Sequence, residues 1–228
     1  GDGFNFGADL NSGFKIADKG FVNFNLSYLD QNKTNRAGKP GKDDLFGVAA
    51  NDPTWGDWLS KNPDLGMNVG QPDSKMGALV VNAEYPLSDI TTLYAFGDVN
   101  IRKGTSFALY RTPYWVSDPN NLLHAAGTTY NGFQPTFNRD VFDNLGSVGI
   151  KSTLFGFNSD FSLTAGSNKV DYIIKNTLNV SLGANSPTEF NGGGYTFSQL
   201  VGNADFSRTF DKVTFGFGTE IRKEQFEA

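Results

Sequence analysis

The residue types that most often carry catalysis are scarce in this chain. The sequence of 228 residues contains one histidine, His124, and no cysteine. A Ser-His-Asp triad would have to use His124, which lies in an expected loop at 120–124, and metal sites built on imidazole or thiolate lack ligands for the same reason. We interpret His124 as a solvated loop residue. We therefore predict that the protein is not an enzyme and uses no cofactor and no metal.

Two other groups of residues have the chemistry to bind ions. The acidic pairs Asp43 with Asp44 and Asp52 with Asp57 offer oxygen ligands for calcium, but their spacing matches no calcium-binding loop. The glycine run 192–194 is of the kind found in phosphate-binding loops, but no lysine follows it in a strand-to-helix context. We expect solvated carboxylates at the acidic positions and a flexible loop at 192–194.

Aromatic residues in polar stretches are the strongest candidates for ligand contact. All three tryptophans fall outside regions of regular periodicity, and the candidates are Trp55, Trp58, Tyr114 and Trp115. An exposed tryptophan packs against something or binds something, and aromatic platforms suit sugars, flavin-like rings or aromatic siderophores. A small-molecule or oligosaccharide ligand is one interpretation. The alternative is that these rings hold the loops against one another.

The elements that would carry such loops are β-strands. From Phe4 to Ile16, apolar side chains alternate with polar ones, and the same period of two returns from Val22 to Tyr28 after a turn at 17–20. Three further hairpins have turns at 87–89, 156–159 and 211–212. The pattern predicts an all-β antiparallel fold of about eight strands in four hairpins, near 4–16, 21–31, 78–86, 91–103, 144–155, 160–170, 198–210 and 213–224.

Short and long connections alternate along the whole chain. The long connections are predicted near 32–77, 104–143 and 171–197, far above the usual loop length of about five residues. Outer-membrane barrels have this alternation, with short periplasmic turns and long extracellular loops. We therefore predict that residues 1–228 form a partial transmembrane β-barrel in a bacterial outer membrane, in contact with its lipid. A small autonomous barrel and a soluble β-sandwich binding module with ligand-binding loops remain alternatives.

The two parities of the strands differ in chemistry. Aromatic residues flank the short turns, as an interfacial girdle would: Phe14, Phe21, Tyr85, Phe155, Phe161, Phe210 and Phe215. The opposite parity carries charged residues, which would line water inside a barrel or form the solvated face of a sandwich. The predicted lumen-facing residues are Asp9, Glu84, Asp98, Arg102, Lys151, Asp205, Glu220 and Arg222.

Composition excludes two other classes of protein. The net charge of -5, without a concentrated basic patch, argues against a nucleic-acid partner. No apolar run reaches the roughly 18 residues of a membrane helix, and the mean hydropathy is -0.36. Alternating strands escape hydropathy averaging, so a β-barrel is compatible with both values.

Several segments resemble the barrel of TonB-dependent outer-membrane receptors of Gram-negative bacteria. The similar segments are 20–28 with 34–38, 168–172 with 176–179, 182–188, 206–211 and 218–224. The resemblance implies a barrel of about 22 strands, an N-terminal plug domain inside it and import of a scarce nutrient, such as a siderophore, a vitamin or an oligosaccharide, driven by the TonB complex. The sequence has no plug, no recognisable TonB box, about a third of those strands and no terminal aromatic residue, so we expect a central barrel segment.

Overall fold

The chain forms one antiparallel sheet in a computed structural model that describes residues 2–39, 47–49 and 51–228. Asp43 and Asp44 lie outside the described residues. The described part holds eight strands: β1 Asn5–Ile16, β2 Gly20–Gln31, β3 Asp73–Ser88, β4 Thr91–Phe107, β5 Thr136–Leu154, β6 Phe157–Lys175, β7 Glu189–Phe210 and β8 Val213–Glu227. A short helix, α1 Gly56–Lys61, and a 3-10 helix, η1 Val180–Asn185, lie in the connections.

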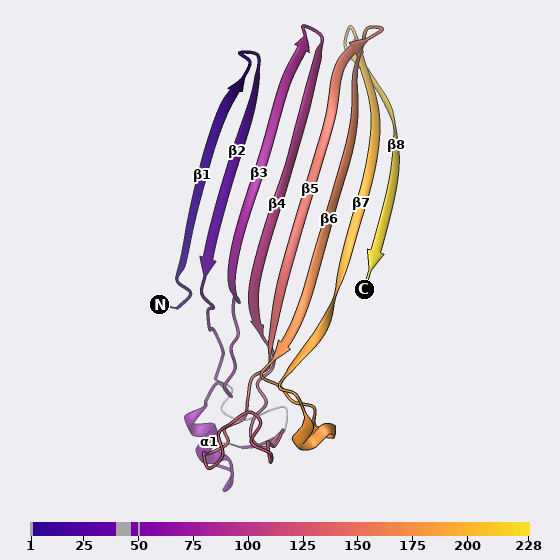
Figure 1. Cartoon of the computed structure of the whole chain (residues 1–228). Helices are drawn as coiled ribbons and strands as arrows, with labels where there is room; N and C mark the ends of the chain where they lie inside the picture. The colour runs from indigo at the N-terminus through magenta and orange to yellow at the C-terminus, as the bar shows by residue number, and fades with distance from the viewer. Residues whose placement is uncertain (1, 40–46, 50) are drawn as a thin grey trace.

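The strands follow one another in the sheet in chain order. Each strand pairs antiparallel with the next, from β1 through β8, and short turns gather at one end while long loops gather at the other (Figure 1). The prediction of an all-β antiparallel fold with eight strands in four hairpins is confirmed. Within the described residues, β1 pairs only with β2 and β8 only with β7, so the sheet is curved but not closed.

Most strands extend further toward the long loops than the sequence pattern predicts. β3 begins at Asp73, β4 ends at Phe107, β5 begins at Thr136 and β6 ends at Lys175. The added residues include charged side chains on the otherwise apolar parity, so the hydrophobic alternation stops while the hydrogen-bonded ladder continues. The long connections between the eight strands are correspondingly shorter, at 32–72, 108–135 and 176–188.

The turn between β5 and β6 lies earlier than predicted. Its two residues are Phe155 and Gly156, with φ of 53° and 77°, and Phe157 already pairs with Leu154. Two successive positive φ values define the tight hairpin turn whose twist matches the flanking strands. The turn predicted at 156–159 is wrong because the position of Phe155 is one that usually takes asparagine or glycine.

The glycine run is not a flexible loop, which corrects the prediction for 192–194. These residues belong to β7, where the register against β6 shifts between Tyr172 and Ile173. Gly193 has φ of 78°, and a Cβ at Gly194 would lie 2.4 Å from the carbonyl oxygen of Val170. The glycines therefore allow a β-bulge and a close approach of two backbones.

Candidate functional site

The pairing register places each predicted parity on one face of the sheet. Residues directly opposite in antiparallel strands share a face, and the chain of pairs Leu10–Leu26–Leu79–Val99 is apolar throughout. The corresponding row on the opposite parity, Asp9 with Ser27, is polar. We call the first surface the apolar face and the second the polar face.

The apolar face has no covering layer in the described part of the chain. Its side chains are exposed in the middle of the sheet, for example Leu10 at 64%, Val148 at 58% and Leu163 at 51%. Of the predicted girdle, Phe14, Tyr85, Phe161, Phe210 and Phe215 lie on this face near the short turns, Phe21 lies on the polar face and Phe155 lies in a turn.

A row of charged side chains ends the apolar face on the side of the long loops. We call it the charged belt, and its members are Asp30, Lys75, Lys103, Asp140, Lys169 and Asp171. Three ion pairs hold it: Lys75 to Asp30 at 3.1 Å, Lys103 to Asp140 at 3.3 Å and Lys169 to Asp171 at 2.9 Å. On β4 the face is free of charge over the nine residues from Leu93 to Ile101, between the short turn and the belt.

The predicted lumen-facing residues all lie on the polar face. The ladder places Asp9 on β1, Glu84 on β3, Asp98 and Arg102 on β4, Lys151 on β5, Asp205 on β7 and Glu220 and Arg222 on β8. Some are already paired, because Arg222 contacts Glu220 at 2.9 Å and Ser27 donates a hydrogen bond to Asp9 at 2.6 Å.

The polar face is not uniformly polar. Val141, Val170 and Val201 on this face are each less than 10% exposed, and the rings of Tyr195 and Phe226 stack at 6.0 Å between centroids. Val141, Val170, Tyr195 and Phe226 lie toward the long loops on β5 to β8, and Val201 lies in the middle of β7. The sequence pattern missed this patch because it followed only the longer apolar alternation of the opposite parity.

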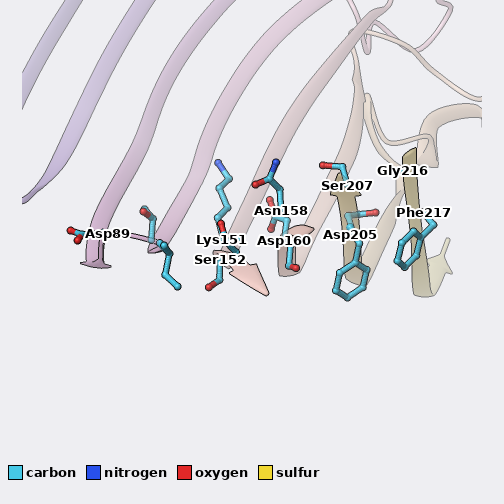
Figure 2. Close-up of a pocket in the computed structure, with 14 residues that line it drawn as sticks. Asp89, Lys151, Ser152, Asn158, Asp160, Asp205, Ser207, Gly216 and Phe217 are labelled. Carbon is cyan, nitrogen blue, oxygen red and sulfur yellow. The ribbon is translucent and has the colours of Figure 1, made fainter. Parts of the chain in front are cut away.

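A pocket opens near the short turns, where β5, β6 and β7 carry charged residues side by side. Lys151 is opposite Asp160, and Asp160 is opposite Asp205, so the three lie in one row on the polar face. Figure 2 shows this row among the residues that line the pocket, with Asn158 and Ser207 beside it. Two carboxylates directly opposite one another are unfavourable unless a cation or a donor compensates them.

Tyr94 supplies such a donor at Asp160, whereas Lys151 pairs with Glu84. The hydroxyl of Tyr94 donates a hydrogen bond to Asp160 Oδ1 at 2.8 Å, and Lys151 Nζ lies 4.7 Å from the centre of the Tyr94 ring and 4.0 Å from Glu84 Oε1. The ring of Tyr94 lies across Gly149, where a Cβ would come within 2.3 Å of its Cζ. The row therefore offers a carboxylate-rich surface, in which Asp205 forms no ion pair with the described residues.

The loop aromatics lie together beyond the loop end of the sheet. The Trp55 ring is 5.4 Å from Tyr114, and the Trp58 ring is 6.0 Å from Tyr114 and 6.2 Å from Tyr110. Trp58 is only 8% exposed. Trp115 makes a different contact, with the Arg111 guanidinium 4.3 Å from its ring centre. The structure thus brings three of the four predicted ligand-binding residues into one cluster, which joins α1 to the loop 108–135.

Gln134 connects all three long loops. Its side-chain oxygen accepts a hydrogen bond from Asn68, its amide donates to the carbonyl of Ala108 at 3.0 Å, and its own carbonyl accepts from Asn176 at 2.8 Å. Gln134 is 8% exposed. A buried amide whose partners come from separate loops fixes those loops relative to one another.

His124 is not a freely solvated residue, which corrects the sequence interpretation. Its Nδ1 lies 2.9 Å from Asp118 Oδ2, and its ring lies 5.1 Å from that of Tyr130. Asp118 also accepts hydrogen bonds from the N–H groups of Leu122 at 2.9 Å and Leu123 at 2.7 Å, with its side chain 1% exposed. Sequence spacing alone did not reveal Asp118, because local carboxylate-to-backbone bonds leave no apolar pattern.

The Asp118 carboxylate makes the loop sensitive to acid. Burial raises the pKa of Asp118, but the N–H groups of Leu123 and Leu122 and the His124 side chain outweigh burial and lower it below its ordinary value. This stabilisation is complete above the ordinary carboxyl pKa of about 3.9 and is lost as pH falls through the lowered one. The protection of the Leu122 and Leu123 amides, relative to their intrinsic exchange rates, should therefore fall below about pH 4. In Asp118→Asn this protection should be low at every pH, and a wild-type profile without the acid step would contradict the assignment.

The other predicted ion ligands have structural partners. Asp52 Oδ1 accepts from the N–H groups of Thr54 at 2.8 Å and Trp55 at 2.7 Å, and Asp57 pairs with Lys61 at 2.7 Å. Among the described residues, no three histidine or acidic side chains lie close enough together to hold a metal ion.

Comparison with known proteins adds no family. No protein-family model matches the chain, and no curated protein matches its sequence. In the part of the chain that the structure describes, no helix is both long enough and apolar enough to cross a membrane.

Proposed function

We propose that this chain forms part of the wall of a bacterial outer-membrane β-barrel, with the apolar face toward lipid and the polar face toward an aqueous lumen. The observation that carries the proposal is the uncovered apolar face bounded by phenylalanines at one end and by the charged belt at the other. Its uncharged stretch on β4, nine residues long, matches the 9–11 residues that a tilted membrane strand needs, about 25 Å of apolar height.

A soluble sandwich accounts less well for the same sheet. In a sandwich the apolar face would be covered by a second sheet about 10 Å away, and here the eight strands form a single layer. Water contact along a face with Leu10, Leu26 and Leu163 each more than half exposed is unfavourable by roughly 25 cal/mol for every Å². Hydrocarbon removes that cost without a covering layer.

The particular barrel we propose is that of a TonB-dependent receptor importing a scarce nutrient, and this step rests on the sequence resemblance. The unpaired outer edges of β1 and β8 support a wall completed by further strands. In such a receptor the carboxylate-rich row at Asp160 and Asp205 would face a plug domain, close to the short periplasmic turns. The loop cluster around Trp58 would face the outside, where a ligand arrives.

Spin labels on single cysteines test the face assignment, because these 228 residues include no cysteine. In outer membranes, labels at Phe24 and Val148 should be reached by oxygen and shielded from a water-soluble nickel chelate. Labels at Asn25 and Ser147 should show the opposite preference if the polar face lines water. Aqueous access at Phe24 and Val148 would refute the membrane assignment.

A further inference from the structure

Arg208 occupies an unusual place on the apolar face. It lies two residues before the end of β7, opposite Phe215. Its guanidinium carbon is 4.7 Å from the centre of the Phe210 ring and 5.5 Å from that of Phe157, and a Cβ on Gly156 would lie 3.0 Å from its Nη1. The aromatic rings and the neighbouring turn therefore hold the guanidinium in place.

This cation has no anionic partner within the described chain. Arg208 forms no ion pair and no side-chain hydrogen bond with the described residues. A guanidinium has five N–H donors in a planar fork that matches a phosphate or carboxylate. On a lipid-facing surface, an arginine is strongly destabilising at mid-membrane but close to neutral near an interface. The position of Arg208 near a short turn fits the interface.

The adjoining turn carries a second unusual residue. Phe155 is 96% exposed and has a φ of 53°, a left-handed conformation that is unfavourable for a bulky L-residue. An exposed ring in a strained turn position gains nothing from packing inside this chain. It gains if it enters the boundary between headgroups and acyl chains, where aromatic rings are enriched.

We propose that Phe155, Phe157, Arg208, Phe210 and Phe215, the rim patch, bind the phosphate of a phospholipid headgroup in the periplasmic leaflet. Arg208 contacts the phosphate, and the phenylalanines contact the glycerol and upper acyl region. The patch matches such a lipid in charge, because it joins one unpaired cation to exposed apolar rings at one height. The inference rests on the membrane placement proposed above and adds a headgroup site to it.

Native mass spectrometry of the full natural protein in detergent, titrated with phosphatidylglycerol, tests the site. Arg208→Gln should lower the apparent affinity for the first lipid about fivefold, as expected for one interfacial cation. The affinity of Arg208→Lys for the first lipid should lie between those of the wild type and Arg208→Gln, because lysine keeps the charge and loses the planar fork. Lys15→Gln is the matched control, since Lys15 is a cation on the polar face one residue from the end of β1, and it should bind like the wild type.

Further measurements distinguish a lipid phosphate from free inorganic phosphate, and distinguish failure of the headgroup site from failure of the barrel proposal. Diacylglycerol, which lacks phosphate, should bind the wild type and Arg208→Gln equally, and millimolar inorganic phosphate should not displace phosphatidylglycerol. Displacement by inorganic phosphate, or equal phosphatidylglycerol affinity in Arg208→Gln and wild type, overturns the lipid site. Every variant should keep heat-modifiable migration on gels. If the wild type itself lacks that migration and never enters bilayers, the barrel proposal fails instead.

Discussion

Replacing Leu26 by arginine is expected to block insertion of the barrel, whereas the same replacement at the next residue, Asn25, is expected to be tolerated. Leu26 lies on the apolar face in the middle of β2, flanked by Leu10 and Leu79 and 53% exposed. An arginine at mid-membrane on the lipid face costs about 2 to 4 kcal/mol, a large part of the total stability of a domain. Asn25 lies on the polar face, where water hydrates the added charge.

The measurement is the heat-modifiable, urea-resistant fraction in outer membranes. Leu26→Arg should reduce it several-fold and lower the free energy of unfolding in bilayers, with Asn25→Arg within about 0.5 kcal/mol of the wild type. In a water-exposed sheet the order would reverse, because Leu26→Arg would then remove an exposed apolar group and improve solubility. Equal effects at the two positions would leave no support for two chemically distinct faces.

The strand parities could be predicted from the sequence because side-chain direction has a period of two. Leu10, Leu26 and Leu79 fall on one face because a register slip of one residue would move the apolar side chains of a strand to the polar face. The alternation ended where Lys75 and Asp140 enter the apolar parity. Those charges end the apolar face but not the hydrogen bonding, so the predicted strands were too short.

Closure of the sheet, unlike the parity of the side chains, could not be predicted from the sequence pattern. It depends on which strands border β1 and β8, and no periodicity within a strand specifies its outer neighbour. The barrel and its outer-membrane location therefore remain proposals, supported by the uncovered apolar face and the charged belt.

Loop contacts were the least predictable part of the candidate site. The tryptophans were identifiable because their size makes free exposure costly, but their partner Tyr110 was not, since it is distant in sequence. Asp118 and Gln134 organise the loops through hydrogen bonds to backbone groups. Such bonds depend on where backbone N–H and C=O groups lie after folding, and no sequence spacing encodes that.

The ring of Trp58 is expected to hold the loop cluster together rather than to contact a ligand directly. It is 8% exposed, and its Nε1 is buried without a hydrogen-bond partner among the described residues. Trp58→Ala removes a buried ring between Tyr110 and Tyr114, a change that costs about 3 to 5 kcal/mol in a packed core. Amide exchange in 51–72 and 108–135 should accelerate at least about a hundredfold if that cost opens the loops.

Trp58→Phe separates packing from hydrogen bonding in the same cluster. The phenyl ring keeps an aromatic contact with Tyr114, and no hydrogen bond is lost because Nε1 has no recorded partner in the described chain. Most of the exchange protection should therefore remain, while Leu109→Ala, at a 41% exposed position of the same loop, should change nothing. If Trp58→Phe opens the loops as fully as Trp58→Ala, the indole N–H holds a partner in the folded protein, and Trp58 becomes a ligand or water contact. Because an unpaired buried N–H costs about 1 to 3 kcal/mol, the packing of Trp58 has to outweigh it, and the aromatic cluster supplies that packing.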